Sequence, residues 1–189
     1  MPRKYAEIAY TDSVKATQDH YGSRGPSERR AAMDADDEHL TESEASFIAE
    51  RDSFYMATVN ADGWPYVQFR GGPVGFLKTL DNQTLAYADF GGNRQYISTG
   101  NLNQNDRVSL FFMDYPNRRR LKLMARTEVF EAADRPELLD RLVDPNYAAP
   151  IERVVLFHVV AFDWNCPQHI TPRMTASEWT EAQAAALSQ

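Results

Sequence analysis

The chain has 189 residues, 43% of them hydrophobic, which is enough to bury one substantial core and short for two domains. Its net charge of −7 excludes the broad basic face of a nucleic-acid-binding protein, so a bound anion must be held by a local group of cations. The single cysteine excludes an internal disulfide, and no secretory signal or membrane-spanning apolar run is visible, so we expect a cytoplasmic protein without nucleic-acid or membrane partners.

The N-terminal part of the chain is polar and irregular in pattern. Ser, Arg, Asp and Gln dominate residues 10–37, which predicts an arm with short helical pieces. Thr41 and Glu44 then have the spacing of a capping box, so a short helix is predicted to begin there. Three regions follow: an N-terminal arm at residues 1–40, a β-rich domain at 41–175 and a C-terminal helix at 176–189.

Short apolar runs separated by turn residues begin at residue 54, a pattern typical of an antiparallel sheet or barrel. Thr175 and Glu178 repeat the capping-box spacing and predict a last helix. The fold class predicted from these patterns is mainly β with peripheral helices. Predicted strands cover residues 54–60, 65–70, 76–80, 84–89, 107–113, 120–130 and 154–162, and predicted helices cover 96–103, 135–143 and 177–187.

The segment Gly91-Gly92-Asn93-Arg94-Gln95 follows a predicted strand and has the composition of a phosphate-binding turn. Glycines allow backbone N–H groups to approach an anion closely, and a guanidinium can bind two phosphate oxygens at once. A second cluster, with Gln68 and Arg70, ends the strand just upstream. Each cluster alone is also ordinary turn chemistry, so both interpretations remain open from the residues.

Two further segments carry unusual polar groups. Three consecutive arginines, Arg118, Arg119 and Arg120, crowd one turn, and such like charges repel one another unless an anion lies nearby. Residues 162–173 place Trp164, Asn165, Gln168, His169 and Arg173 between prolines that fix the backbone direction.

Other kinds of site find little support in the sequence. Cys166 and His169 could both bind a metal, but two ligands are too few for a zinc site, so no metal is expected. Cys166 is expected to be a buried small hydrophobic residue, and His158, inside an apolar run, a core histidine. Walker-type, dinucleotide-binding, nucleophile-elbow and zinc-protease motifs are absent. A phosphate would therefore be bound by arginines on a β framework.

The order of these motifs resembles the pyridoxamine 5'-phosphate oxidase-like FMN-binding proteins. The similarity covers residues 41–173 and includes residues 57–65, the corner at 69–73, the turn at 92–96 and the strand entrance at 105–111. It implies a split β-barrel of the FMN-binding type that works as a homodimer, with FMN in two clefts between the subunits.

The resemblance also implies roles for particular residues. Arg94 becomes the main phosphate ligand, with Asn93 and Gln95 beside it. Arg119, Arg120 or Lys122 would place a cation near the pyrimidine edge of the flavin. The cofactor-binding residues expected on this basis are Gln68, Arg70, Lys78, Tyr87, Asp89, Asn93, Arg94, Gln95, Arg119, Arg120 and Lys122, and the substrate-side candidates are Trp164, Asn165, Gln168, His169 and Arg173.

The substrate does not follow from the resemblance. The vitamin oxidases carry an Arg-x-His pattern in their C-terminal segment, and this chain lacks it, which argues against pyridoxamine phosphate. We expect an oxidoreductase acting on a small organic substrate. A flavin-binding or storage module without turnover, and a haem or deazaflavin binder on the same barrel, are the alternatives.

Overall fold

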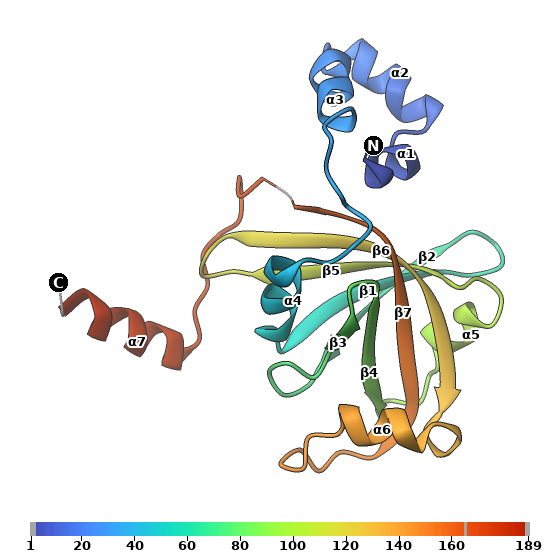
Figure 1. Ribbon diagram of the computed structural model, residues 1–189, viewed down its shortest axis with the longest axis vertical. Helices are drawn as coiled ribbons and strands as arrows, with labels where there is room; N and C mark the ends of the chain where they lie inside the picture. The colour runs from blue at the N-terminus through green and yellow to red at the C-terminus, as the bar shows by residue number, and fades with distance from the viewer. Residues whose placement is uncertain (1–2, 165, 188–189) are drawn as a thin grey trace.

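The computed structural model describes residues 3–164 and 166–187, and its centre is one seven-stranded antiparallel sheet (Figure 1). The sheet curls around a core, and the mainly β fold with peripheral helices is confirmed. The strands are β1 (Ser53–Val59), β2 (Pro65–Gly71), β3 (Lys78–Asp81), β4 (Thr84–Phe90), β5 (Arg107–Asp114), β6 (Arg119–Glu131) and β7 (Ile151–Trp164). The helices are α1 (Lys4–Ala9), α2 (Asp12–His20), α3 (Arg24–Ala31), α4 (Glu42–Ala49), α5 (Ile97–Leu102), the 3-10 turn η1 (Ala132–Asp134), α6 (Pro136–Leu142) and α7 (Ala176–Leu187).

The strand order is β2-β1-β5-β6-β7-β4-β3, with every neighbouring pair antiparallel. Hairpins link β1 to β2, β3 to β4 and β5 to β6, whereas the long strand β7 returns to lie between β6 and β4. Strands β2 and β3 are the two edges, so the sheet is an open, split barrel.

The core lies on the inner face of the curled sheet. Side chains alternate along a strand, so one face of each strand supplies the core and the other faces outward. Phe54 lies at the centre and contacts the rings of Phe76, Tyr87, Phe112 and Phe157. A second, smaller cluster forms where α6 packs Leu142 against β4 and β7.

Helix α4 covers one end of the core and is attached there by Glu44. The predicted capping box is present: Thr41 donates its backbone N–H to Glu44 Oε2 over 3.0 Å. Glu44 Oε1 also accepts a hydrogen bond from Trp164 Nε1 at 2.7 Å, and the Trp164 ring packs edge-on against Phe47. Trp164, expected on the substrate side, therefore joins the end of β7 to α4.

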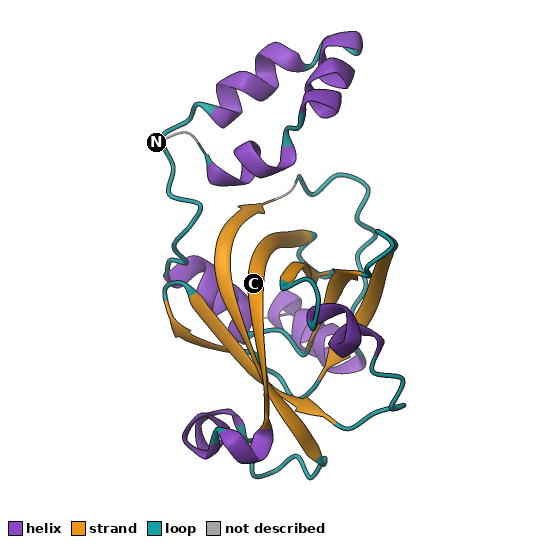
Figure 2. Cartoon of the chain, turned by 90° about the vertical axis from the view of Figure 1, so that its right-hand side faces the viewer, coloured by secondary structure: helices purple, strands orange, loops and turns teal. Residues whose placement is uncertain are grey.

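The N-terminal arm is more regular than the sequence suggested, because it forms the three helices α1 to α3 beside the barrel (Figure 2). Asp37, only 3% exposed, attaches it: its carboxylate accepts the backbone N–H groups of Lys4 and Tyr5. Arg3 adds ion pairs to Asp37 and to Asp163 of β7. The arm is thus fixed to the far end of β7.

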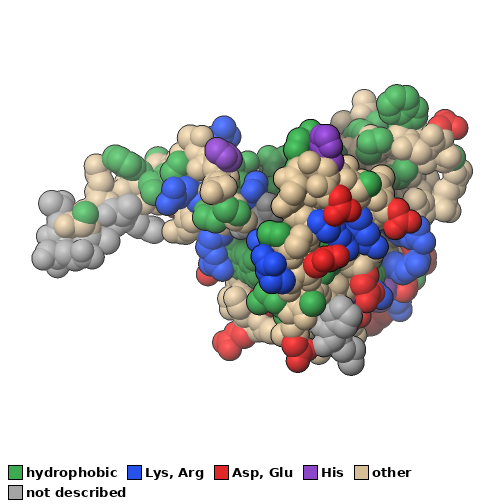
Figure 3. All heavy atoms as spheres, turned by 90° about the horizontal axis from the view of Figure 1, so that it is seen from above, with side chains coloured by type: hydrophobic (Ala, Val, Ile, Leu, Met, Phe, Trp, Pro, Cys, Tyr) green, Lys and Arg blue, Asp and Glu red, His purple; other side chains and the backbone are tan. Residues whose placement is uncertain are grey.

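The C-terminal segment leaves the barrel and ends in α7, which stands away from the rest of the molecule (Figure 3). The predicted capping box is present here too, with Thr175 donating its backbone N–H to Glu178 Oε2 at 2.7 Å. Within the described ranges, no helix is long and apolar enough to cross a membrane.

The hydrogen bonds of Glu44 make stability depend on pH. Burial opposes its ionisation, but the hydrogen bonds from Thr41 and Trp164 outweigh burial and lower the pKa of Glu44. A lowered pKa in the folded state means that the stabilisation is present above the ordinary glutamate pKa and is lost as the pH falls through the folded value. Glu44→Gln should therefore lower the free energy of unfolding at pH 7 by about 1–2 kcal/mol. Urea unfolding from pH 7 to pH 3 should show this difference shrinking below about pH 4.3. Glu42→Gln, on an exposed residue in the same turn, is the control, and an equal loss there would contradict the role of Glu44.

Candidate functional site

A small hollow at the corner after β4 brings together Arg70 and Arg94, two of the cations that the sequence singled out. It has a volume of about 50 Å³ and opens beside the edge strand β2 and the start of α5. Gln68 and Arg70 project toward it from β2, and Asn93 and Arg94 from the corner itself. The remaining lining residues are Phe90, Gly92, Tyr96, Ser98, Thr99, Glu152 and Arg153.

Asp89 orients two of the arginines. Its carboxylate is 4% exposed and accepts one hydrogen bond from Arg70 Nη1 at 2.9 Å. Arg153 binds the other oxygen with Nε at 3.0 Å and Nη2 at 2.8 Å, while Glu152 pairs with the same guanidinium at 2.7 Å. Burial opposes the charge of Arg153, but these carboxylates outweigh it and raise the pKa. Asp89 thus fixes the guanidinium groups that border the hollow and does not itself line it.

The corner contains backbone strain, but not at its glycines. Arg94 and Tyr96 have φ values of 59° and 53°, in the left-handed region that a side chain disfavours by roughly 1 kcal/mol or more. The hydroxyl of Tyr96 accepts a hydrogen bond from Arg94 Nε at 3.3 Å and donates one to Glu152 at 3.1 Å. At Gly92 no atom lies within 4 Å of where a Cβ would stand. The glycine turn therefore provides open space for a ligand and not a special backbone angle.

The donors around the hollow fit a phosphate. Arg70 Nε is buried without a hydrogen-bond partner among the described residues, and Arg94 is exposed with only Tyr96 on its Nε. Ser98 donates its hydroxyl to Gln68 Oε1 at 2.9 Å, which leaves the Gln68 amide N–H groups free to donate. A volume of about 50 Å³ exceeds the ~30 Å³ share of one water but is far below the roughly 300 Å³ of a small-ligand pocket. The hollow can take an anionic end group and not a whole ring system.

Four predicted residues meet at this hollow, and three contributors were missed. Gln68, Arg70, Asn93 and Arg94 line it, and Asp89 lies directly behind it. Ser98 and Thr99 were missed because nothing marked the first turn of α5. Arg153 was missed because it faces Asp89 only through the pairing of β4 with β7, which the sequence does not reveal.

Three other predicted residues lie off this hollow. Tyr87 is buried in the aromatic core and stacks on Phe157; burial, and then the charge of Asp89, raise the pKa of its phenol. Lys78 is exposed on the edge strand β3, and Gln95 is exposed outside the lining of the hollow. Of these three, only Tyr87 is shut off from any surface ligand, so its expected position beside a flavin is corrected.

The run of arginines is divided between the two faces of β6. Arg119 stacks over the rings of Phe47 and Trp164, and Lys122 pairs with Asp163 at 3.3 Å beside Tyr5. These contacts lie near the end of the 14-residue strand β7, whereas Arg153 is near its start. Within one chain, Arg119, Arg120 and Lys122 therefore do not line the hollow after β4. Their expected position near the pyrimidine edge of the flavin stays a prediction.

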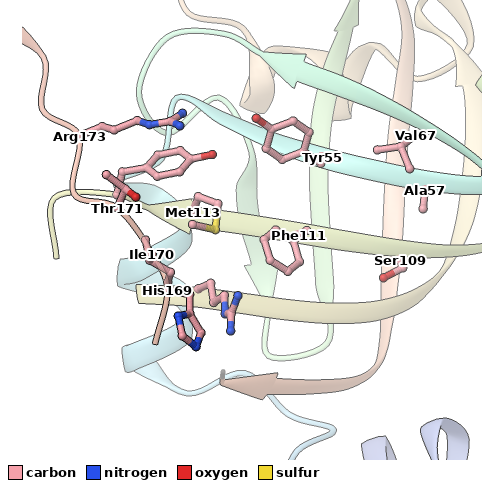
Figure 4. A pocket seen from close by; sticks show the side chains of 12 residues that line it. Tyr55, Ala57, Val67, Ser109, Phe111, Met113, His169, Ile170, Thr171 and Arg173 are labelled. Carbon is pink, nitrogen blue, oxygen red and sulfur yellow. The ribbon is translucent and has the colours of Figure 1, made fainter. Parts of the chain in front are cut away.

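A second, larger hollow lies on the outer face of the sheet and contains Arg120, His169 and Arg173 (Figure 4). Gln168 is exposed outside its lining, and Asn165 falls outside the described residues. Cys166 is exposed and not buried as expected, and His158 is partly exposed and bonds Glu128 at 2.8 Å instead of lying in the core. The predicted substrate-side residues thus separate into His169 and Arg173 at this hollow and Trp164 in a packing role.

The family model of pyridoxamine 5'-phosphate oxidase matches residues 40–162, which are most of the chain and the whole barrel. The chain belongs to the pyridoxamine 5'-phosphate oxidase family. No curated protein sequence matches it.

Solved structures agree with this family at the level of the fold. HupZ of Group A Streptococcus has a TM-score of 0.54 at 17% identity, covering 71% of this chain and 99% of its own. A Lactobacillus delbrueckii protein described as a pyridoxamine 5'-phosphate oxidase has a TM-score of 0.51 at 24% identity, covering 67% and 94%. An FMN-binding protein of Syntrophomonas wolfei reaches 0.50 at 16% identity, covering 65% and 83%. These identities are low, so the likeness concerns the barrel alone.

The role of Asp89 can be tested by removing its charge. Asp89→Asn keeps the size of the side chain but leaves the partly buried Arg70 without its carboxylate and Arg153 with Glu152 alone. Breaking a buried pair in this way costs about 3–5 kcal/mol of the free energy of unfolding. Asp106→Asn is the matched control, since it breaks an exposed pair with Arg126 and should cost no more than about 1 kcal/mol. Urea unfolding at pH 7 measures both, and similar losses would show that Asp89 is an ordinary surface partner.

Proposed function

We propose that this protein is an FMN-binding flavoprotein that acts as an oxidoreductase on a small organic substrate. The observation that carries the proposal is the hollow at the corner after β4, where Arg70, Arg94 and Arg153 converge around room for one anionic group. Asp89 and Glu152 offset two of these three charges, so a net positive charge remains for a phosphate in an otherwise acidic protein. The family and the FMN-binding relative of the same fold support a flavin phosphate as the occupant.

The residues around the hollow have different roles in the proposed phosphate binding. Arg94 and Arg70 would bind phosphate oxygens, while Gln68 and Asn93 would donate amide N–H groups. Ser98 holds the Gln68 amide, and Asp89 holds Arg70 and Arg153, so these groups are oriented before a ligand arrives. Bound FMN would supply the redox chemistry, and the protein would set its position and surroundings.

We further propose that the protein works as a homodimer, with the cofactor held between two copies. The phosphate hollow is too small to enclose a flavin ring, so other walls are needed. The edge strand β2 shows an apolar outer side, with Val67 60% exposed and Phe69 58% exposed, next to Trp64 at 71%. An exposed apolar edge strand invites pairing or aggregation unless something covers it. A second copy of the chain covers it most simply.

The phosphate assignment predicts that Arg94→Ala loses FMN. Arg94 is exposed and bonds only Tyr96, so the variant should fold normally and lower FMN affinity at least about tenfold, the effect of one charge-assisted hydrogen bond. Flavin absorbance of the purified protein and titration of FMN into the apoprotein measure this. Arg126→Ala, on an exposed arginine of β6, is the control and should keep full affinity.

Several outcomes would contradict the proposal. Undiminished FMN affinity in the Arg94 variant removes the phosphate assignment. A Soret band in the spectrum of the purified wild type would show that the cofactor is haem, and a deazaflavin spectrum would show that it is a deazaflavin, in place of FMN. If the bound flavin is not reduced under anaerobic conditions by NADH, NADPH or another donor, the protein is a flavin-binding module without turnover.

The proposed dimer predicts that a charge on the outer side of β2 prevents dimerisation. Phe69→Asp places a charge on the outer side of β2 and should convert the protein from a dimer to a monomer, with loss of bound flavin in parallel. Light scattering after size-exclusion chromatography reports the mass, and visible absorbance reports the flavin. Tyr21→Asp, on a residue 77% exposed in the arm, should leave both unchanged. A monomeric wild type that holds FMN fully would refute the shared site.

A further inference from the structure

The hollow on the outer face of the sheet has the size of a ligand site. Its volume is about 600 Å³, within the usual range of roughly 300–1,000 Å³ for small-molecule pockets. It lies between the middle of strands β1, β2 and β5 and the C-terminal segment 169–173. It is therefore separate from the phosphate hollow, which opens on the other side of β2.

The floor of this hollow is flat and apolar. Tyr55, Phe111 and Met113 lie beside one another across the sheet, as Figure 4 shows. Ala57 and Ser109 line the same face farther along, where their short side chains leave space above the backbone. A planar ligand can lie on such a surface and contact ring faces, the arrangement in which aromatic groups attract one another.

The charged groups of the hollow are two arginines that lack a balancing carboxylate. Arg120 enters from β6 and Arg173 from the C-terminal segment, with His169 nearby, and none of the lining residues is Asp or Glu. Neither arginine forms an ion pair within residues 3–164 and 166–187. Uncompensated arginines are unexpected in a chain with 27 acidic and 20 basic residues. They mark this wall as a place for an anion.

Arg120 also has an unused donor. Its Nε is buried, and no described residue accepts a hydrogen bond from it. A buried donor without a partner costs about 1–3 kcal/mol, which an acceptor on a ligand would recover. Arg70 Nε at the phosphate hollow is also buried, so each hollow contains an arginine whose Nε–H has no hydrogen-bond acceptor among the described residues.

The C-terminal segment that forms the wall is held in place. Ile170 is 9% exposed and anchors it, and His169 next to it has φ of 63°, a strained left-handed conformation. The Arg173 guanidinium lies 5.3 Å from the centre of the Tyr115 ring. A hydrogen bond with the Tyr55 hydroxyl, then burial, raise the pKa of Tyr115, so its phenol keeps its proton and can donate a hydrogen bond. Donors that are already oriented before a ligand arrives favour binding.

We infer that this hollow binds the substrate, and that the substrate is a planar, largely apolar organic anion such as an aromatic carboxylate or sulfonate. The ring lies on Tyr55, Phe111 and Met113, and the anionic group meets Arg120 and Arg173. The role as substrate site rests on the proposed flavin function. The two hollows open on opposite faces of β2, so the substrate role requires that the second copy of the proposed dimer places its flavin at the open side of this hollow.

The fluorescent anion 8-anilinonaphthalene-1-sulfonate tests the inference on the purified flavin-loaded protein. It should bind saturably, and its binding should perturb the visible absorption bands of the flavin. Arg120→Gln and Arg173→Gln should each weaken binding about tenfold, the loss of one charge-assisted hydrogen bond. Arg126→Gln, on an exposed arginine of β6 paired with Asp106, is the control and should bind the anion as the wild type does. The uncharged analogue N-phenyl-1-naphthylamine should be indifferent to all three changes.

Each possible outcome decides the matter. Equal loss of both probes in the arginine variants would mean that the hollow selects apolar ligands without regard to charge, which overturns the inference. Binding without a change in the flavin bands would remove the substrate role. Arg173 is exposed, so its variant stays informative if Arg120→Gln fails to fold. If the protein purifies without flavin and does not bind it, the proposed function is wrong. The absorption spectrum therefore distinguishes a failure of the proposed function from a failure of the substrate-site inference.

Discussion

The ion pair of Asp89 with Arg70 joins two strands that are not neighbours in the sheet. Arg70 lies on the edge strand β2, while Asp89 and Arg153 lie on β4 and β7, at the other side of the strand order. Strand β2 is not hydrogen-bonded to β4 or β7 through the backbone, so the Asp89–Arg70 ion pair connects β2 to the β4–β7 side of the open sheet. The same bridge sets the arginines around the phosphate hollow. Stability and anion binding therefore depend on one group, and nearly complete burial of Asp89 makes that dependence strong.

Side-chain alternation distributes the remaining chemistry. On β2, Gln68 and Arg70 face the phosphate hollow while Val67 and Phe69 face outward. On β6, Arg119 stacks on aromatic rings at one face and Arg120 enters the larger hollow at the other. Arg119 and Arg120 thus lie in different surroundings on opposite faces of β6, which relieves the repulsion expected between them. Arg120 has no ion-pair partner among the described residues and lines the hollow in which we propose an anion binds.

The sequence predicted what local rules control. Both capping boxes, the hairpins and the corner with Arg94 followed from patterns within a few residues. Arg153 could not be found in this way, because its contact with Asp89 depends on the register of β4 against β7. Tyr87 was misplaced because β4 is buried on both faces and carries no alternation to assign its sides. His158 was misplaced for the opposite reason, since an apolar run on β7 concealed one outward-facing position paired with Glu128.

The two hollows differ in how their charge is arranged, and that difference suggests how their ligands differ. At the phosphate hollow, Asp89 and Glu152 already offset most of the charge on the arginines, which suits a cofactor that stays bound and adds to a preformed network. At the larger hollow, Arg120 and Arg173 have no such partners, and one wall comes from a segment of the chain outside the sheet. A ligand there must supply the balancing charge itself. An anion exchanges with water more easily at the larger hollow, where one wall is the C-terminal segment 169–173. It exchanges less easily at the hollow after β4, where the ion pairs of Asp89 connect strands of the barrel. The charge arrangement of each hollow therefore suits the ligand proposed for it, a retained cofactor at the first and an exchanging substrate at the second.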